Sequence, residues 1–148
     1  MLYQRTVQTL NFIQKLSEEQ KIIFLKAFAH LARADGDFEE IERKFIMNIA
    51  GLYGISEDHM PEILAENTDA YIIEEVAKIK DRRAAMELVK EMCMLAHVSD
   101  DFGDAELLFI SKVGQAMGIE PEKIEQISKW VIDRIIWLEE GKLIFEEV

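Results

Sequence analysis

The sequence predicts an all-α protein, and three observations support this fold class. Apolar residues recur at spacings of three and four along almost the whole chain, as on the buried faces of amphipathic helices. Only 2 prolines and 7 glycines interrupt the 148 residues, and helix-forming residues such as Ala, Leu, Glu and Lys are plentiful. No segment shows the alternation of apolar and polar residues that strands joined by hairpin turns require. We therefore expect one helical bundle that occupies residues 1–148 as a single domain.

Start and stop signals divide the first half of the chain into helices. Ser17, followed by Gln20, forms a capping box that opens the second helix. The run Asp35-Gly36-Asp37 breaks that helix, and Gly54 is placed to end the next one. The helices expected in this half cover 3–15, 18–34, 38–52, 57–64 and 70–79.

The second half shows the same kinds of signal. Asp81 is placed to cap a helix that runs to a break at 99–101, and the next helix covers 102–117 before Gly118. Pro121 occupies a favoured first-turn position of the last helix. We expect Gly141 to end this helix and to leave an apolar tail, 143–145.

The two halves align without gaps at a constant spacing of 64 residues. We therefore predict an internal duplication, with repeat one at about 17–66 and repeat two at about 81–138, packed as one bundle with pseudo-twofold symmetry. If this is correct, both phenylalanine pairs of the alignment occupy equivalent buried positions. The matched pairs include Ser17 and Asp81, Phe38 and Phe102, Phe45 and Phe109, and Gly54 and Gly118.

The first break resembles the motif of a known family. Residues 31–38, L-A-R-A-D-G-D-F, are followed by Glu42-Arg43, and this pattern is similar to the A-D-G-x-hydrophobic-x-x-x-E-R signature of TerB-like proteins. These are the tellurite-resistance TerB domains and the related amino-terminal domain of the DjlA co-chaperone. The resemblance spans about 17–137. It implies an all-α fold with duplicated helices, a cytoplasmic or membrane-peripheral place, no established catalysis, and divalent-cation binding through acidic loop residues.

The acidic residues around the two breaks are the candidate metal ligands. A side chain one turn into a helix leans back toward the helix start, so the glutamates of the two sites point at their loops. Oxygen-only ligands suit calcium or magnesium. The second copy departs from the family motif, because Leu107 replaces Arg43. The candidate ligands are Asp35, Asp37 and Glu42 in repeat one, and Asp100, Asp101 and Glu106 in repeat two.

A structural interpretation of the same residues remains open. Asp37 and Asp101 are placed to serve as N-caps, and Glu42 and Glu106 are placed to accept hydrogen bonds from loop N–H groups. An EF-hand is excluded, because Glu40 occupies the loop position that requires glycine. His97 lies beside the second loop, so among the three histidines it is the candidate metal ligand.

Composition excludes several classes of function. The 29 acidic residues against 17 Lys and Arg give a net charge of −12, which repels nucleic-acid phosphates and anionic lipid headgroups. The single cysteine, Cys93, excludes an internal disulfide and is expected to be a buried, inert thiol. No signal peptide or membrane span is evident, so we expect a cytoplasmic protein. No nucleophile–base set or phosphate loop occurs, so we expect no enzyme activity.

The last helix carries two features whose environment is open. Trp130 and Trp137 lie on one side of this helix. We favour packing of both rings at the edge of the core, with Arg134 stacked on an indole. The alternative is an exposed groove that binds a partner. The tail 143–145 is expected to fold back along the bundle, or else to cross to a second molecule.

The function that the sequence favours is that of a non-catalytic TerB-like domain in a stress- or envelope-linked complex. It is expected to act through a protein partner, as a monomer or weak homodimer without membrane insertion, and to bind calcium or magnesium weakly. The alternatives are a pure interaction scaffold without metal chemistry and a metal-dependent hydrolase.

Overall fold

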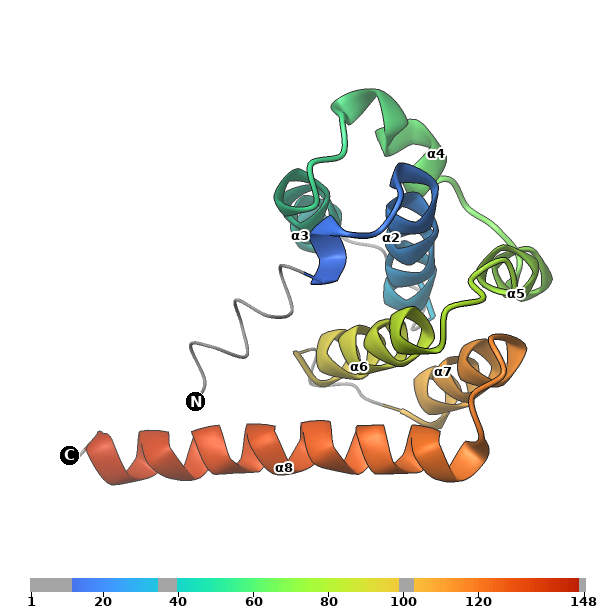
Figure 1. Cartoon of the computed structure of the whole chain (residues 1–148). Coiled ribbons are helices and arrows are strands. Elements are labelled where there is room, and N and C mark those ends of the chain that lie inside the picture. Colours follow the sequence, from blue (N-terminus) through green and yellow to red (C-terminus); the bar gives the residue numbers. More distant parts are fainter. Residues whose placement is uncertain (1–11, 35–39, 99–102, 147–148) are drawn as a thin grey trace.

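The computed structural model describes residues 12–34, 40–98 and 103–146. Within these ranges every regular element is a helix, so the all-α prediction is confirmed. Residues 12–14 are helical, and the rest of the helix expected over 3–15 lies almost entirely outside the described residues. The elements labelled in Figure 1 are α2 (Glu18–Ala32), α3 (Glu40–Leu52), the 3-10 helix η1 (Glu57–His59), α4 (Met60–Leu64), α5 (Asp69–Val76), α6 (Arg82–Val98), α7 (Asp104–Ala116) and α8 (Pro121–Phe145).

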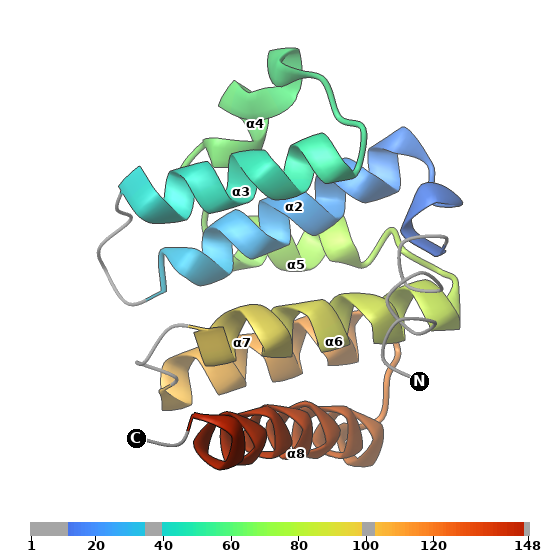
Figure 2. The ribbon, with the colours of Figure 1, turned by 90° about the vertical axis from the view of Figure 1, so that its left-hand side faces the viewer.

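The helices form stacked tiers. Figure 2 shows α2 and α3 side by side above α6 and α7, with α8 below them and α4 at the opposite end. Helix α2 packs against α3, α4, α5 and α6, and α8 packs against α6 and α7. In Figure 1 the C-terminal half of α8 extends beyond α6 and α7. The first half of α8 therefore belongs to the bundle, and its second half projects from it.

Local caps set the ends of the helices as the sequence predicts. The Ser17 hydroxyl accepts a hydrogen bond from the backbone N–H of Gln20, whose side chain accepts one from the N–H of Ser17, which completes the capping box. The Asp81 carboxylate accepts a hydrogen bond from the N–H of Ala84 at 2.9 Å. Gly54 and Gly118 end α3 and α7 at φ values of 75° and 84°, which favour glycine.

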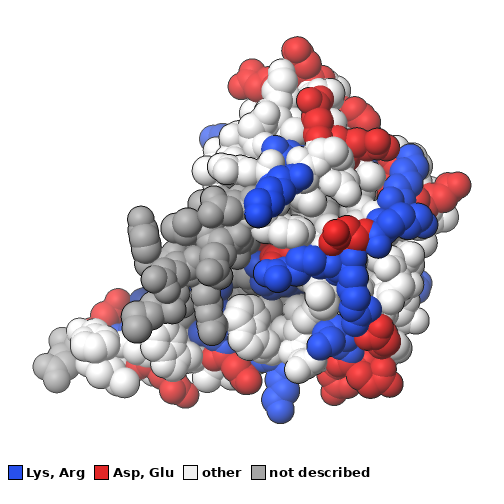
Figure 3. Space-filling model, viewed as in Figure 1, with Lys and Arg blue, Asp and Glu red and all other residues white. Residues whose placement is uncertain are grey.

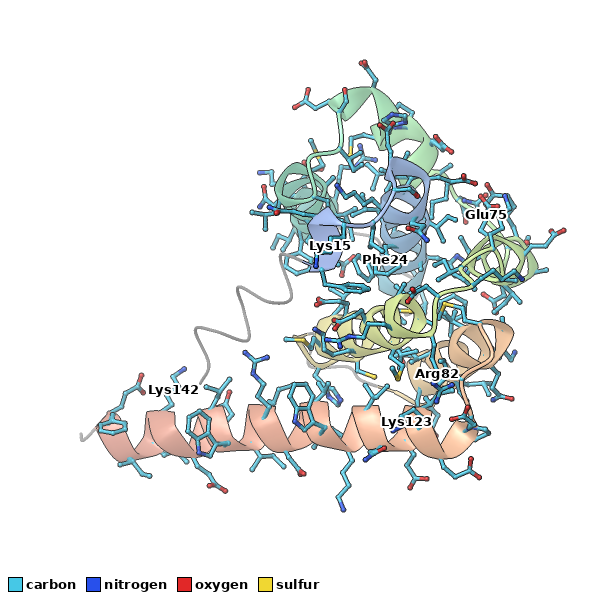
Figure 4. The ribbon with its side chains drawn as sticks, viewed as in Figure 1. Lys15, Phe24, Glu75, Arg82, Lys123 and Lys142 are labelled. Atoms are coloured by element: carbon cyan, nitrogen blue, oxygen red, sulfur yellow. The ribbon has the colours of Figure 1, made fainter. Side chains whose placement is uncertain are left out.

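A single hydrophobic core joins the two tiers. Phe24 lies inside the bundle, as Figure 4 shows, and its side chain is fully buried. Other fully buried side chains come from α2, α3, α5, α6 and α7. They include Leu25, Phe28, Ile46, Ile72, Leu88, Met92 and Ile110. The free thiol of Cys93 is also buried, as predicted.

Helix boundaries recur at the spacing of 64 residues, but burial does not recur throughout. Helices α3 and α7 end at corresponding positions, and the turns after them correspond as well. Phe109 is 5% exposed, whereas Phe45 is 39% exposed, so the prediction that they occupy equivalent buried positions is wrong. The reason is that α7 packs against α5, α6 and α8, whereas α3 packs chiefly against α2. The duplication and its pseudo-twofold symmetry therefore stay predictions, and the other pair, Phe38 and Phe102, lies outside the described residues.

The end of the chain differs from the prediction. Gly141 does not end the last helix, since α8 continues to Phe145. Glycine inside a helix costs only about 1 kcal/mol relative to alanine, and this cost is too small to end the helix at Gly141. Leu143, Ile144 and Phe145 are 79%, 66% and 85% exposed, so this segment does not fold back along the described part of the chain. A continuous helix cannot turn back on itself, and this explains the error.

Candidate functional site

Four of the six predicted metal ligands lie outside the residues that the structure describes. These are Asp35, Asp37, Asp100 and Asp101. Of the other two, Glu42 is half-buried in the first turn of α3 and Glu106 is buried in the first turn of α7. No group of three or more His, Cys, Asp or Glu side chains suited to a metal ion occurs in 12–34, 40–98 and 103–146. Cation binding at the loops therefore stays a prediction.

Glu106 performs the structural role that the sequence left open. Its carboxylate accepts a hydrogen bond from the backbone N–H of Gly103 at 2.9 Å. Gly103 is the N-cap of α7, so the predicted N-cap at Asp101 is wrong: the helix starts two residues later than expected. Because one oxygen of Glu106 already binds the helix start, its capacity to bind a cation is reduced.

The histidines of the described region do not converge on a metal site. His30 Nε2 lies 2.5 Å from Asp69 Oδ1, and His59 Nε2 lies 2.9 Å from Glu18 Oε1. His97 is half-buried near the end of α6, and this burial lowers its pKa. Each histidine is thus accounted for by burial or by a polar contact with a carboxylate.

Two hollows on the surface occupy corresponding positions in the two halves of the chain. One, of about 350 Å³, lies between α2, α4 and α5, and the other, of about 320 Å³, lies between α6 and the start of α8. Five of their lining residues are related by the spacing of 64. These pairs are Glu19 and Arg83, Ile22 and Met86, Ile23 and Glu87, Lys26 and Lys90, and Glu62 and Gln126.

The hollow beside α2 contains a closed ion network. Lys26 Nζ lies 3.0 Å from Tyr71 Oη, from Glu75 Oε1 and from Glu62 Oε1. Burial lowers the pKa of Lys26, but hydrogen bonds with Tyr71, Glu62 and Glu75 outweigh burial and raise it above its ordinary value. The cation is thus held charged by its own chain, and this hollow serves to join α2 to α4 and α5.

The hollow beside α8 has a different chemistry. Its wall includes three cationic side chains and one buried carboxylate, Glu87, which lies 2.9 Å from Arg83 Nε and 2.6 Å from Lys90 Nζ. Figure 3 shows Lys and Arg side chains gathered over this part of an otherwise acidic protein, and Figure 4 places Lys123 at the start of α8. Met86, Ile127 and Trp130 supply apolar surface. We call this the basic hollow, lined by Arg83, Met86, Glu87, Lys90, Lys123, Gln126, Ile127 and Trp130.

Large apolar side chains are exposed along one side of α8 beyond the basic hollow. Trp137 is 59% exposed, so the predicted packing at the core edge is wrong for this ring, whereas Trp130 is 42% exposed and lines the hollow beside Met86 and Ile127. Residues seven apart on an α-helix lie on nearly the same side, so the tryptophans share this side with the exposed end of the helix. We call this surface the α8 face: Trp130, Trp137, Leu138, Ile144 and Phe145.

The start of α8 is fixed firmly to the bundle. Arg82 at the beginning of α6 donates two hydrogen bonds to the Glu120 carboxylate, at 2.8 and 2.7 Å. Ile124 and Val131 are buried, and Ser128 between them is buried as well. Sequence reasoning identified the tryptophans and the apolar end of the chain but separated them at Gly141. Their seven-residue spacing through Ile144 was the signal that they form one surface.

Comparison with known proteins gives one match. The family model of tellurite resistance protein TerB matches residues 2–65. Searches of curated proteins and of solved structures found no match. The matched segment contains α2, α3 and α4, and it includes the loop whose residues resemble the TerB motif. Residues 2–65 of this chain are therefore TerB-like, which supports a TerB-like family assignment.

Proposed function

We propose that this chain is a non-catalytic TerB-like interaction module that binds a protein partner in a stress- or envelope-linked complex of the cytoplasm. The observation that carries the proposal is the α8 face. Burial of each large apolar side chain is worth about 1.5–3 kcal/mol, so a row of exposed ones is costly in water without a partner. Contiguous apolar patches, especially those with tryptophan, are typical of protein–protein interfaces.

The charge of the chain narrows the class of partner. A net charge of −12 disfavours phosphate backbones and anionic membranes. None of the helices in the described ranges combines the length and apolar character that crossing a bilayer requires. A protein surface that offers apolar pockets fits the α8 face better than either of these partners.

The interaction is tested by crosslinking in the native cell, followed by identification of the captured proteins. The test variant is Trp137→Glu, and the matched control is Ile136→Glu, because Ile136 is 49% exposed but lies on the other side of α8. We expect the wild type and Ile136→Glu to capture the same proteins and Trp137→Glu to lose them, with equal melting temperatures. Equal capture by all three proteins overturns the proposal.

We also propose weak binding of calcium or magnesium at the acidic loops as a second property of this domain. Glu42 stands in the first turn of α3, from which a side chain leans toward the preceding loop with Asp35 and Asp37. Without a full oxygen shell, the dissociation constant should be on the order of 10⁻⁴ to 10⁻³ M. Calorimetry compares the wild type with the double variant Asp35→Asn, Glu42→Gln. Identical heats leave only the capping role.

The internal duplication is part of the proposal for how this domain is built. The corresponding ends of α3 and α7, the two positive-φ glycines and the two corresponding hollows support it. On this account the two copies have diverged in role. The first copy closes its hollow with Glu75 of α5, whereas the second copy leaves its hollow beside the exposed face of α8.

A further inference from the structure

We infer that the α8 face pairs in an antiparallel manner with the α8 face of a second copy of this chain. In this pair, the end of one α8, at Phe145 and Glu146, lies at the basic hollow of the other copy. The inference rests on the proposed function, because it takes the α8 face as the interaction surface and names a second copy as its partner.

The α8 face begins at the basic hollow and continues to the end of the helix on the same side. Lys123 and Trp130 line the hollow and are seven residues apart, and Trp137 and Ile144 continue that spacing. From Trp130 to Phe145 the helix rises by about 22 Å at 1.5 Å per residue. Figure 4 shows Lys123 and Lys142 toward opposite ends of α8, with the bundle covering only the part near Lys123. The free part of the helix is therefore long enough to accept a second helix.

Charge decides the direction of pairing. The basic hollow, with Arg83, Lys90 and Lys123, lies at the start of the α8 face, and Glu139, Glu140 and Glu146 lie near its end. An antiparallel pair sets the hollow of each copy beside the acidic end of the other α8, whereas a parallel pair would set the two hollows side by side. The opposed helix dipoles favour the same direction.

A register centred between Trp137 and Leu138 keeps the apolar residues of the two α8 faces together. It brings Trp130 of each copy level with Phe145 of the other. Arg134 then lies against Gly141, where an added Cβ would meet nothing within 4 Å, so the guanidinium has room. Among the described residues, Arg134 Nε is buried without a hydrogen-bond partner, and the charge of Arg134 acts on Glu91 of its own chain.

The basic hollow suits the end of the second helix. The register places Phe145 of the second copy against Trp130, and aromatic pairs of this kind add stability beyond simple burial. Glu146 follows directly, on the side where Arg83, Lys90 and Lys123 supply the positive charge of the hollow. Phe145 of the second copy thus meets the apolar side chains of the basic hollow, and Glu146 meets its cationic side chains. The net charge of −12 per copy works against association, so the dimer is weak and strengthens as salt screens that repulsion.

The first test measures the mass of the purified full chain by sedimentation equilibrium from about 1 µM to 1 mM at physiological salt. We expect a concentration-dependent dimer for the wild type and for Ile136→Glu, and at least about tenfold weaker association for Trp137→Glu. Thermal unfolding confirms that the variants are folded. A wild type that stays monomeric at 1 mM overturns the inference, while capture of another protein through Trp137 in the crosslinking experiment would leave the proposed function intact.

The second test fixes the direction of the pair and does not depend on the strength of surface ion pairs. Chains carrying Arg134→Cys are mixed with chains carrying Gly141→Cys, because these two positions lie on the α8 face and are level in this register. The chains are joined with a short thiol crosslinker, while the native Cys93 is buried. The antiparallel register predicts crosslinks between the two kinds of chain, and few within either kind alone. Crosslinks between identical variants would indicate a parallel pair and would overturn the inference.

Discussion

On α2, the ammonium of Lys26 lies 3.0 Å from Oε1 of Glu75 on α5, and Lys26 is only 5% exposed. The same nitrogen lies 5.4 Å from the ring centre of Tyr71, so the cation is enclosed by an aromatic ring and carboxylates. A hydrogen bond from Lys78 lowers the pKa of Glu75, burial opposes this, and Lys26 lowers the pKa further. This network holds the short helix α5 against α2.

The network predicts a loss of stability in acid. Because the pKa of Glu75 is lower in the folded chain, its contribution is present above the unfolded pKa of about 4.3 and is lost as pH falls through the folded pKa. Glu75→Gln should lower the free energy of unfolding by about 1–3 kcal/mol at pH 7, and the variant should lose less stability than the wild type on acidification. Urea unfolding between pH 7 and pH 3 measures both. Glu74→Gln, at an exposed position of the same helix, is the control, and parallel pH profiles for wild type and Glu75→Gln would refute the prediction.

Phe109 and Phe45 should differ in their contribution to stability. Phe109 is 5% exposed and its ring packs against that of His30, with centroids 4.9 Å apart, whereas Phe45 is 39% exposed. Truncation of Phe109 to Ala should therefore cost about 3–5 kcal/mol, and truncation of Phe45 to Ala clearly less. Chemical denaturation of both variants measures the difference. Equal costs would mean that the two positions are equivalent after all.

Two helical glycines should respond to alanine in opposite directions. A Cβ at Gly114 of α7 would lie 2.6 Å from Ile124 Cδ1 of α8, so Gly114→Ala should destabilise by about 1–3 kcal/mol. A Cβ at Gly51 of α3 would meet nothing within 4 Å, so Gly51→Ala should stabilise by up to about 1 kcal/mol. Melting temperatures report both changes. A stabilising Gly114→Ala would show that α8 can shift away from α7.

The thiol of Cys93 should be inert in the folded chain. Burial raises its pKa to about 11, although a hydrogen bond with Ser128 opposes this. Because the thiolate is the reactive form, a disulfide reagent at pH 8 should label Cys93 only at the rate of unfolding. Absorbance of the released thiol, with and without urea, measures this. Rapid labelling without urea would contradict the burial of Cys93.

The candidate site was only partly predictable from the sequence. The tendency of Glu106 to accept a hydrogen bond from a loop N–H is local, and the structure confirms it with Gly103. The ion network of Lys26 was not predictable, because its partners Glu62, Tyr71 and Glu75 come from helices far along the chain. The basic hollow was missed for the same reason, since it forms only where α8 lies beside α6.

The sequence by itself determined where most described helices begin and end. The caps at Ser17 and Asp81 and the turns at Gly54 and Gly118 act within a few residues, so their positions follow from local hydrogen bonds and allowed φ angles. Only the tertiary structure decided which side chains are buried. Phe109 and Phe45 have corresponding places in the sequence, but α7 is enclosed by α5, α6 and α8, and α3 is not. The exposure of Trp137 was decided in the same way, because burial requires a neighbouring element and the bundle ends before α8 does.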